Sequence, residues 1–179
     1  MTTTEARDEG LKWQVGVWDR ISLTYLREVD ARFAPVIDGV IRRAELQPGE
    51  RVLDLGTGTG SVAIKAASSI GPNGIVTAID ISPEMLAIAR QRSASTGLSN
   101  ISFHLGRAEE IPAPSGQFDV VLASLSLIYV IDRDSAAREL ARVLRAPADG
   151  LLLPSGVARR RRILCFCNRP PGASRPSRQ

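Results

Sequence analysis

The chain has 179 residues, of which 44% are hydrophobic and 23% are charged. This is the composition of an ordinary globular chain, and no run approaches the roughly 18 apolar residues of a membrane span. The net charge of +4 comes from the C-terminal end, because residues 157–179 hold seven arginines and no acid. Removing those seven charges leaves −3 for residues 1–156, which argues against a specific nucleic-acid partner.

Cysteine and histidine are scarce. Cys165 and Cys167 are the two cysteines and His104 is the one histidine. These numbers exclude a disulfide framework and argue against a histidine-based metal site, so we predict no metal and a reducing, cytoplasmic location. The polar residues 1–7 predict no secretory leader. Nothing in the sequence predicts an oligomeric state.

Residues 1–46 are predicted to form a helical cap. Apolar residues recur at helical spacing over residues 5–45, with Pro35 as an interruption. Trp13, Trp18 and Tyr25 allow two interpretations: an aromatic lid over a ligand, or core packing on one helix face.

From residue 51 onward, short apolar strands alternate with helices. Strands are predicted at 51–55, 75–79, 101–105 and 118–123, with a weak fifth at 151–153, and helices at 61–70, 82–95 and 135–144. This alternation predicts an α/β, Rossmann-like fold, a mainly parallel sheet with helices on both faces. Ligands of such sheets bind beyond the carboxyl ends of the strands.

A glycine motif lies at the first strand end. Asp54-Leu55-Gly56-Thr57-Gly58-Thr59-Gly60 follows a predicted strand and precedes a helix, and Asp80 ends the next strand. Glycines let the backbone turn sharply against a ligand, and a carboxylate in the position of Asp80 accepts hydrogen bonds from ribose hydroxyls. Together they indicate an adenosine-containing cofactor. The dinucleotide pattern G-x-G-x-x-G requires glycine at 61, where this chain has serine.

These motifs resemble those of the class I S-adenosylmethionine-dependent methyltransferases. The resemblance runs from about residue 36 to 145, through Val52–Gly60, Ile79–Leu86, Gln117–Val121 and Arg142–Arg145, and is greatest to the ubiquinone/menaquinone-biosynthesis type, methyltransferase type 11. It implies that Asp54 and the loop of Gly56, Thr57, Gly58 and Gly60 hold the methionine half of the cofactor. It also implies that Asp80 holds the ribose, that Ile81 and Met85 flank the adenine, that Arg107 and Ala108 border the adenine edge, and that Ser124 faces the methyl group.

The resemblance implies S-adenosylmethionine-dependent methylation of carbon or oxygen in a small-molecule acceptor. Two alternatives stay open: an NAD(P)-dependent oxidoreductase, and a cofactor-binding protein without catalysis. No catalytic residue is predicted. His104 falls inside a strand, Tyr129 is interpreted as packing, and the acids Glu109 and Glu110 as solvated.

The C-terminal part departs from the family pattern. After Arg142–Arg145 the family continues with Pro-Gly-Gly and a long apolar strand, whereas this chain continues with Ala146-Pro147-Ala148-Asp149-Gly150. We therefore expect residues 47–153 to form an incomplete cofactor domain lacking its last strands, and residues 154–179 to form a basic, disordered tail. A shifted reading frame after Arg145 is our hypothesis for this departure.

Overall fold

The computed structural model describes residues 3–146 and 162–166, and it confirms the helical N-terminus. Helix α1 spans Thr3–Thr24, a π-helical turn η1 spans Tyr25–Val29, and α2 spans Ala34–Ala44 with Pro35 in its first turn. The fixed φ of proline suits a helix start, so Pro35 begins α2 rather than interrupting it.

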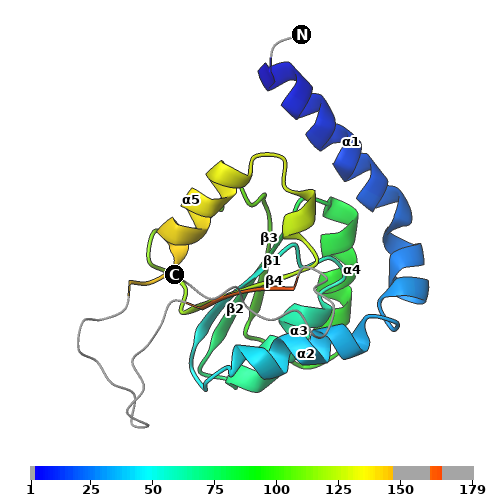
Figure 1. Cartoon of the computed structure of the whole chain (residues 1–179). Helices are drawn as coiled ribbons and strands as arrows, with labels where there is room; N and C mark the ends of the chain where they lie inside the picture. Colours follow the sequence, from blue (N-terminus) through cyan, green and yellow to red (C-terminus); the bar gives the residue numbers. More distant parts are fainter. Residues whose placement is uncertain (1–2, 147–161, 167–179) are drawn as a thin grey trace, which may run out of the picture.

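The rest of the described chain alternates strands and helices as predicted. Their bounds are β1 Arg51–Leu55, α3 Ser61–Ile70, β2 Ile75–Asp80, α4 Pro83–Ala94, β3 Ile101–Leu105, β4 Val120–Ser124, a 3-10 turn η2 Leu127–Tyr129, α5 Arg133–Val143 and β5 Arg162–Phe166. Up to α5 the strands and α-helices lie within two residues of the predicted bounds, and the short turn η2 was not predicted. The strands form one parallel sheet in the order β3-β2-β1-β4-β5 (Figure 1).

Helices cover both faces of the sheet, and each face has its own core. Neighbouring strand residues point to opposite faces, so Val52 packs with α2 and α3 while Leu53 packs with α5. Both side chains are fully buried. This double coverage explains why the strands read as continuous apolar runs in the sequence.

Strand β5 differs from our expectation for the C-terminal segment. Arg162–Phe166 lies inside the stretch expected to be disordered, and it pairs in parallel with β4. The Arg162 guanidinium donates to the carbonyls of Ala44 and Glu45 at 2.7 and 2.9 Å and pairs with Glu50. The apolar residues that follow Arg162 thus form a strand in a segment whose composition predicted disorder. The weak strand predicted at 151–153 lies outside the described residues.

The sheet order places its switch point at β1. The chain leaves β1 toward β2 on one side and returns to β4 on the other, so loops diverge at the carboxyl ends of β1 and β4 and leave a crevice there. Helix α1 packs along α4 and crosses beside this edge (Figure 1). None of the helices in residues 3–146 is long and apolar enough to cross a bilayer.

Candidate functional site

The glycine loop after β1 has a backbone that other residues do not readily adopt. Gly56, Gly58 and Gly60 have φ angles of 71, 54 and 87°. The N–H groups of Gly56 and Thr57 donate to the Ile79 carbonyl at 2.8 and 3.0 Å, and that of Gly60 donates to Thr57 at 2.9 Å. A Cβ atom on Gly56 would lie 2.3 Å from the Cβ of Ser126. The loop is therefore tied to the end of β2 and to its own turn at Thr57, and it needs glycine at 56.

Asp54 holds this loop from behind. It is 1% exposed, and its Oδ2 accepts a hydrogen bond of 2.7 Å from the Thr57 hydroxyl. The backbone N–H of Ala63, in the first turn of α3, also donates to it. Burial raises the pKa of Asp54 to about 7; the Thr57 hydrogen bond opposes that rise and the charge of Asp80 adds to it. Asp54 thus occupies the anion position at the start of α3.

Asp80 ends β2 opposite the loop. Its Oδ2 accepts from the Gly58 N–H at 2.8 Å and its Oδ1 from the Ser82 N–H at 2.9 Å. Burial raises its pKa, while these backbone hydrogen bonds oppose the rise. The Ile81 N–H is a third backbone donor to Asp80. An ionised carboxylate has about four acceptor sites, so Asp80 retains acceptor capacity for a further donor such as a ribose hydroxyl.

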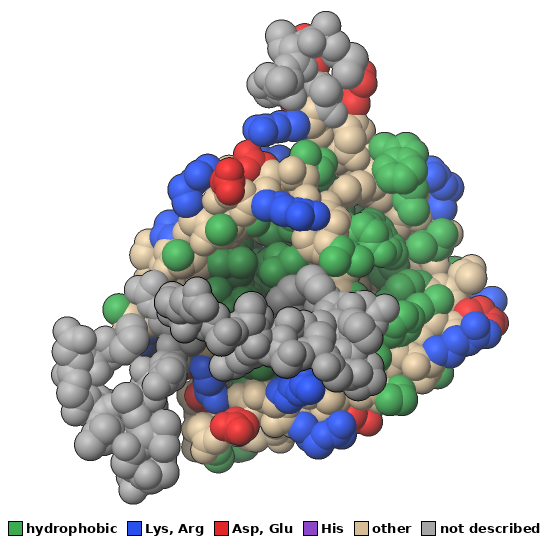
Figure 2. Space-filling view, in the orientation of Figure 1, with side chains coloured by type: hydrophobic (Ala, Val, Ile, Leu, Met, Phe, Trp, Pro, Cys, Tyr) green, Lys and Arg blue, Asp and Glu red, His purple; other side chains and the backbone are tan. Residues whose placement is uncertain are grey.

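A cavity of about 290 Å³ opens over these groups. In Figure 2 it is a hollow in which hydrophobic side chains gather. Most of the predicted site residues line it: Gly56, Gly58, Asp80, Ile81, Met85, Arg107, Ala108 and Ser124. The remaining three, Asp54, Thr57 and Gly60, are not among the lining residues. We call Gly56, Gly58, Asp80, Ile81 and Met85 the loop wall.

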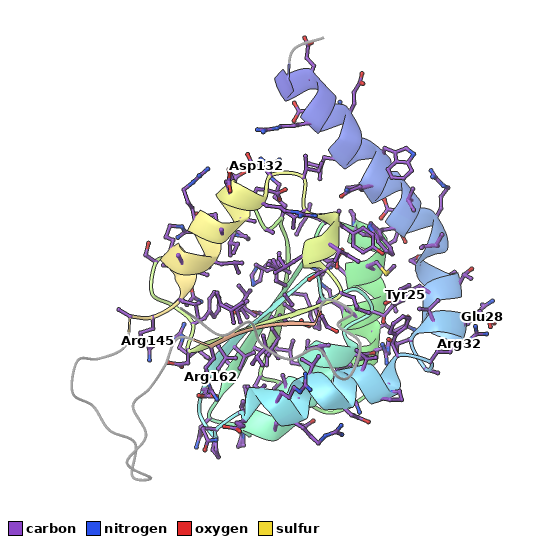
Figure 3. The ribbon with its side chains drawn as sticks, viewed as in Figure 1. Tyr25, Glu28, Arg32, Asp132, Arg145 and Arg162 are labelled. Atoms are coloured by element: carbon purple, nitrogen blue, oxygen red, sulfur yellow. The ribbon has the colours of Figure 1, made fainter. Side chains whose placement is uncertain are left out.

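The N-terminal segment supplies the opposite side, here called the cap wall, which consists of Leu11, Gln14, Trp18, Tyr25 and Val29. The Trp18 ring meets Tyr25 edge-on at 6.2 Å and Tyr129 at 5.0 Å between centroids. Burial raises the pKa of Tyr25, and the charge of Asp30 adds to that rise. Tyr25 lies on the inner side of the segment, whereas Glu28 and Arg32 lie on its outer surface (Figure 3).

Two of the three aromatic residues considered for a lid are placed where they could form one. Trp18 and Tyr25 line the cavity, but Trp13 is 69% exposed on the outside of α1. Tyr129 also lines the cavity, so its interpretation as packing describes only its contact with Trp18. His104 is exposed in β3 and is not among the lining residues.

The turn after β4 is strained where it meets the cavity. Leu125 has φ of 59°, a conformation that costs free energy for a bulky side chain. Next to it, the Ser126 hydroxyl donates to the Leu55 carbonyl at 2.6 Å and ties this turn to β1. Ser124 and Leu125 both line the cavity.

Sequence reasoning missed three polar residues of the cavity: Ser126, described above, Glu109 and Gln14. Glu109 is not simply solvated: its Oε1 accepts from the N–H groups of Ile131 and Asp132 at 3.1 and 3.2 Å, which fixes the rim before α5. Gln14 donates to the Tyr129 carbonyl at 2.9 Å. None of the three stands in a motif, so no local signal marks them. Arg107 lines the cavity while pairing with Glu110 at 3.1 Å.

A parallel sheet of this order, a glycine loop after β1, an acid at the end of β2 and a cavity across the strand ends define the class I S-adenosylmethionine-dependent methyltransferase architecture. A family model described as a methyltransferase domain matches residues 46–153. The chain belongs to this methyltransferase-domain family.

Two relatives show the range of this family. Nocamycin O-methyltransferase of Saccharothrix syringae is 35% identical over 130 residues, which cover 73% of this chain and 44% of the relative. The ubiquinone/menaquinone biosynthesis C-methyltransferase UbiE of Xanthomonas oryzae pv. oryzae is 38% identical over 114 residues, covering 63% and 45%. The match therefore spans less than half the length of either relative.

Solved structures agree with the fold. A SAM-dependent methyltransferase from Aquifex aeolicus superposes with a TM-score of 0.59 at 28% identity, covering 63% of this chain and 60% of that one. The (4+2) cyclase SpnF superposes with a TM-score of 0.58 at 34% identity, covering 63% and 41%. The architecture is thus not confined to proteins named for methyl transfer, whereas nothing in these comparisons supports the oxidoreductase alternative.

Proposed function

We propose that this protein transfers a methyl group from S-adenosylmethionine to carbon or oxygen of an uncharged small molecule. The observation that carries the proposal is one cavity with two unlike sides. The loop wall ends in a carboxylate suited to a nucleoside, and the cap wall opposite is aromatic and apolar.

Charge and hydrogen bonding at the loop wall favour a cationic cofactor over a dinucleotide. The N–H groups of Gly56, Thr57, Gly58 and Gly60 donate within the protein, so they are not available to cradle a diphosphate. Two buried acids stand beside the loop: Asp80 and, behind the loop, Asp54, whose pKa of about 7 leaves it partly ionised at neutral pH. A sulfonium gains from that arrangement, whereas a diphosphate is repelled by it.

We assign the cofactor contacts by what each group offers. Asp80 accepts hydrogen bonds from the ribose hydroxyls, and Ile81 and Met85 provide apolar surface for the adenine ring. Gly58 has no atom within 4 Å of where a Cβ would be, so its backbone is open to a ligand. Asp54 acts indirectly, since it holds the loop through Thr57. Ala108 and Arg107 border the far end of the cavity.

The acceptor is expected to lie against the cap wall near Ser124. That region has apolar surface from three aromatic rings, those of Trp18, Tyr25 and Tyr129. Its neutral polar residues are Gln14, Ser124 and Ser126. The charged lining residues Arg107 and Glu109 already interact with Glu110 and with the N–H groups of Ile131 and Asp132. A charged acceptor would therefore lose hydration there for little compensating attraction. The sequence-based prediction of a cytoplasmic location fits a small diffusible acceptor.

Bound S-adenosylmethionine supplies an activated methyl group on a positively charged sulfur. The chain's own task is then to align the acceptor with that methyl and to exclude water. The cap wall excludes water over one side and the Ser126 tie to Leu55 keeps the turn with Ser124 in place. Methyl transfer to a neutral acceptor releases one proton. No histidine is among the described lining residues, so that proton passes to water or to a lining carboxylate such as Glu109.

A second candidate is cofactor binding without methyl transfer. The structural similarity to SpnF favours keeping it, because that neighbour is a cyclase. The two candidates share the loop wall and differ only in what happens at the cap wall.

Calorimetry with S-adenosylhomocysteine and with NAD tests the cofactor. We expect saturable binding of the first and none of the second. Transfer of a labelled methyl group to a panel of phenols and enolisable ketones tests the reaction. Binding with turnover supports the proposal, binding without turnover supports the second candidate, and binding of NAD alone contradicts both.

A further inference from the structure

A polar cluster outside the cavity joins the N-terminal segment to the glycine loop. Asp30 follows the π-helical turn Tyr25–Val29, and its N–H donates to the Tyr25 carbonyl at 2.9 Å. Its Oδ1 accepts from the hydroxyls of Thr59 and Ser61 at 3.1 and 2.7 Å. Asp30 is not among the residues that line the cavity.

Arg92 of α4 closes the cluster from the other side. Its guanidinium pairs with Asp30 at 3.1 Å and donates to the Thr59 carbonyl and the Ser61 hydroxyl, both at 2.8 Å. The side chains of Asp30 and Arg92 are 14% and 31% exposed, so water screens their pairing less than it screens a surface pair. Ionised partners also make these hydrogen bonds stronger than neutral ones.

The cluster contacts the glycine loop at Thr59, where the loop is buried and packed against α4. Thr59 lies between Gly58 and Gly60, whose φ angles are both positive, and it is 1% exposed. A Cβ atom on Gly60 would lie 3.0 Å from the Cβ of Ala89, so the loop rests directly on α4. Arg92 and Asp30 therefore grip the loop at Thr59 while Gly58, one residue earlier, faces the cavity.

The same π-helical turn also builds the cap wall. Tyr25 and Val29 line the cavity and Asp30 directly follows them. π-helical turns of this kind often mark functional sites. The N-terminal segment makes a second contact near Asp80, the acid at the end of β2. There the Ser82 hydroxyl donates to Asp19 of α1 at 2.5 Å, and the Ser82 N–H donates to Asp80. Docking of the segment thus bears on both halves of the loop wall.

We propose that Asp30 is a positioning residue that couples docking of the N-terminal segment to the shape of the glycine loop. It acts through Thr59, Ser61 and Arg92, and cofactor affinity depends on it although it touches no cofactor. The inference rests on the proposed cofactor and extends it. By reciprocity, cofactor binding must also strengthen docking of the segment.

Trp18 provides a direct reporter of docking. The chain has two tryptophans, and Trp13 is exposed while Trp18 lines the cavity, so a Trp13→Phe background leaves emission from Trp18 alone. In that background S-adenosylhomocysteine is titrated into the full chain and into its Asp30→Ala, Asp30→Asn and Asp38→Ala variants. Asp38→Ala is the matched control, since it removes an exposed ion pair with Lys65 from the same N-terminal part of the chain.

Asp30→Ala is expected to raise the Kd for S-adenosylhomocysteine about tenfold or more, as for lost hydrogen bonds to a charged group. It should also diminish the change in Trp18 emission on binding. Asp30→Asn keeps an acceptor for the hydroxyls but loses the ion pair with Arg92. Its Kd should therefore lie between that of the chain with Asp30 and that of the Asp30→Ala variant. Asp38→Ala should leave both readouts unchanged, and a thermal melt establishes that each variant is folded at the titration temperature.

An unchanged Kd in a folded Asp30→Ala variant overturns the coupling and leaves the proposed function intact. An equal loss of affinity in Asp38→Ala overturns it as well, because the effect would then belong to the segment in general. A wild-type chain that binds no S-adenosylhomocysteine overturns the proposed function and this inference with it.

Discussion

The loop wall and the cap wall of the cavity are built in opposite ways. The loop wall is held by hydrogen bonds that its backbone N–H groups donate to partners near in sequence, such as that from the Gly58 N–H to the Asp80 carboxylate, 22 residues apart. The cap wall is held by side chains that meet distant partners, such as Gln14 with the Tyr129 carbonyl 115 residues away. The loop wall depends on backbone conformations that few residues adopt. The cap wall depends on the packing of apolar side chains from separate parts of the chain.

This difference separates cofactor binding, which the family shares, from acceptor preference, which differs between its members. Backbone geometry fixes the cofactor end and leaves little choice of residue. Aromatic and apolar side chains at the cap wall can be exchanged at moderate cost, so acceptor preference can change there without disturbing the cofactor. The O- and C-methyltransferase relatives are consistent with such a division.

The largest expected effect comes from Gly56→Ala. The new Cβ would lie 2.3 Å from Ser126 at a φ of 71°, so the turn after β4 must move. We expect more than about 2 kcal/mol of lost stability and about hundredfold weaker cofactor binding, measured by urea denaturation and calorimetry. Gly97→Ala is the control, since φ there is 72° but nothing lies within 4 Å. It should cost about 1 kcal/mol and leave cofactor affinity unchanged; equal effects of the two changes would contradict this account of the loop wall.

Removal of the strand-end acid should have the next largest effect. Asp80→Ala takes away the acceptor for the ribose and leaves the Gly58 and Ser82 N–H groups without their partner. We expect cofactor binding to weaken by about 1–3 kcal/mol, with a smaller loss in Asp80→Asn because an amide oxygen still accepts. Unchanged affinity by calorimetry in a folded Asp80→Ala variant rules out the ribose assignment.

The buried acid behind the loop predicts a dependence of stability on pH. The pKa of Asp54 rises from 3.8 to about 7 on folding, mainly through burial. Between these values the folded protein holds a proton that the unfolded chain has released, so the free energy of unfolding falls as pH rises from about 4 to 7. One proton gives a slope of at most about 1.4 kcal/mol per pH unit.

Urea denaturation of the wild type and Asp54→Asn across this pH range measures that slope. The asparagine retains an acceptor for the Thr57 hydroxyl but does not titrate. The wild type should therefore lose stability relative to the variant as pH rises. A stability difference that stays constant with pH would show that Asp54 does not carry the proton.

The smallest effect is expected at the cap wall. Trp18→Phe weakens the two edge-on ring contacts and should cost about 1 kcal/mol of stability, whereas Trp13→Phe on the exposed face should cost less than about 0.5 kcal/mol. Both are read from chemical denaturation. Cofactor affinity should change less in Trp18→Phe than in Asp80→Ala, and the reverse order would mean that the two walls are not separate in function.

The sequence predicted the loop wall better than the cap wall for a physical reason. Positive φ angles demand glycine and a strand-end acid has a fixed offset, so Gly56, Gly58 and Asp80 leave a local pattern. Leu11, Gln14 and Glu109 leave none, because only the folded chain brings them to the cavity. Strand β5 was missed because pairing with β4 and the contacts of Arg162 outweigh a composition that reads as disordered.

The left-handed Leu125 gives the cavity one unyielding side. A bulky residue keeps such a conformation only where its surroundings dictate it, and here the neighbouring Ser126 is pinned to β1. We therefore expect the turn after β4 to keep the same conformation whichever ligand is bound. We expect a bulkier acceptor to be accommodated by outward displacement of α1. The extent of that displacement, rather than the position of the strand ends, then limits the size of the acceptor.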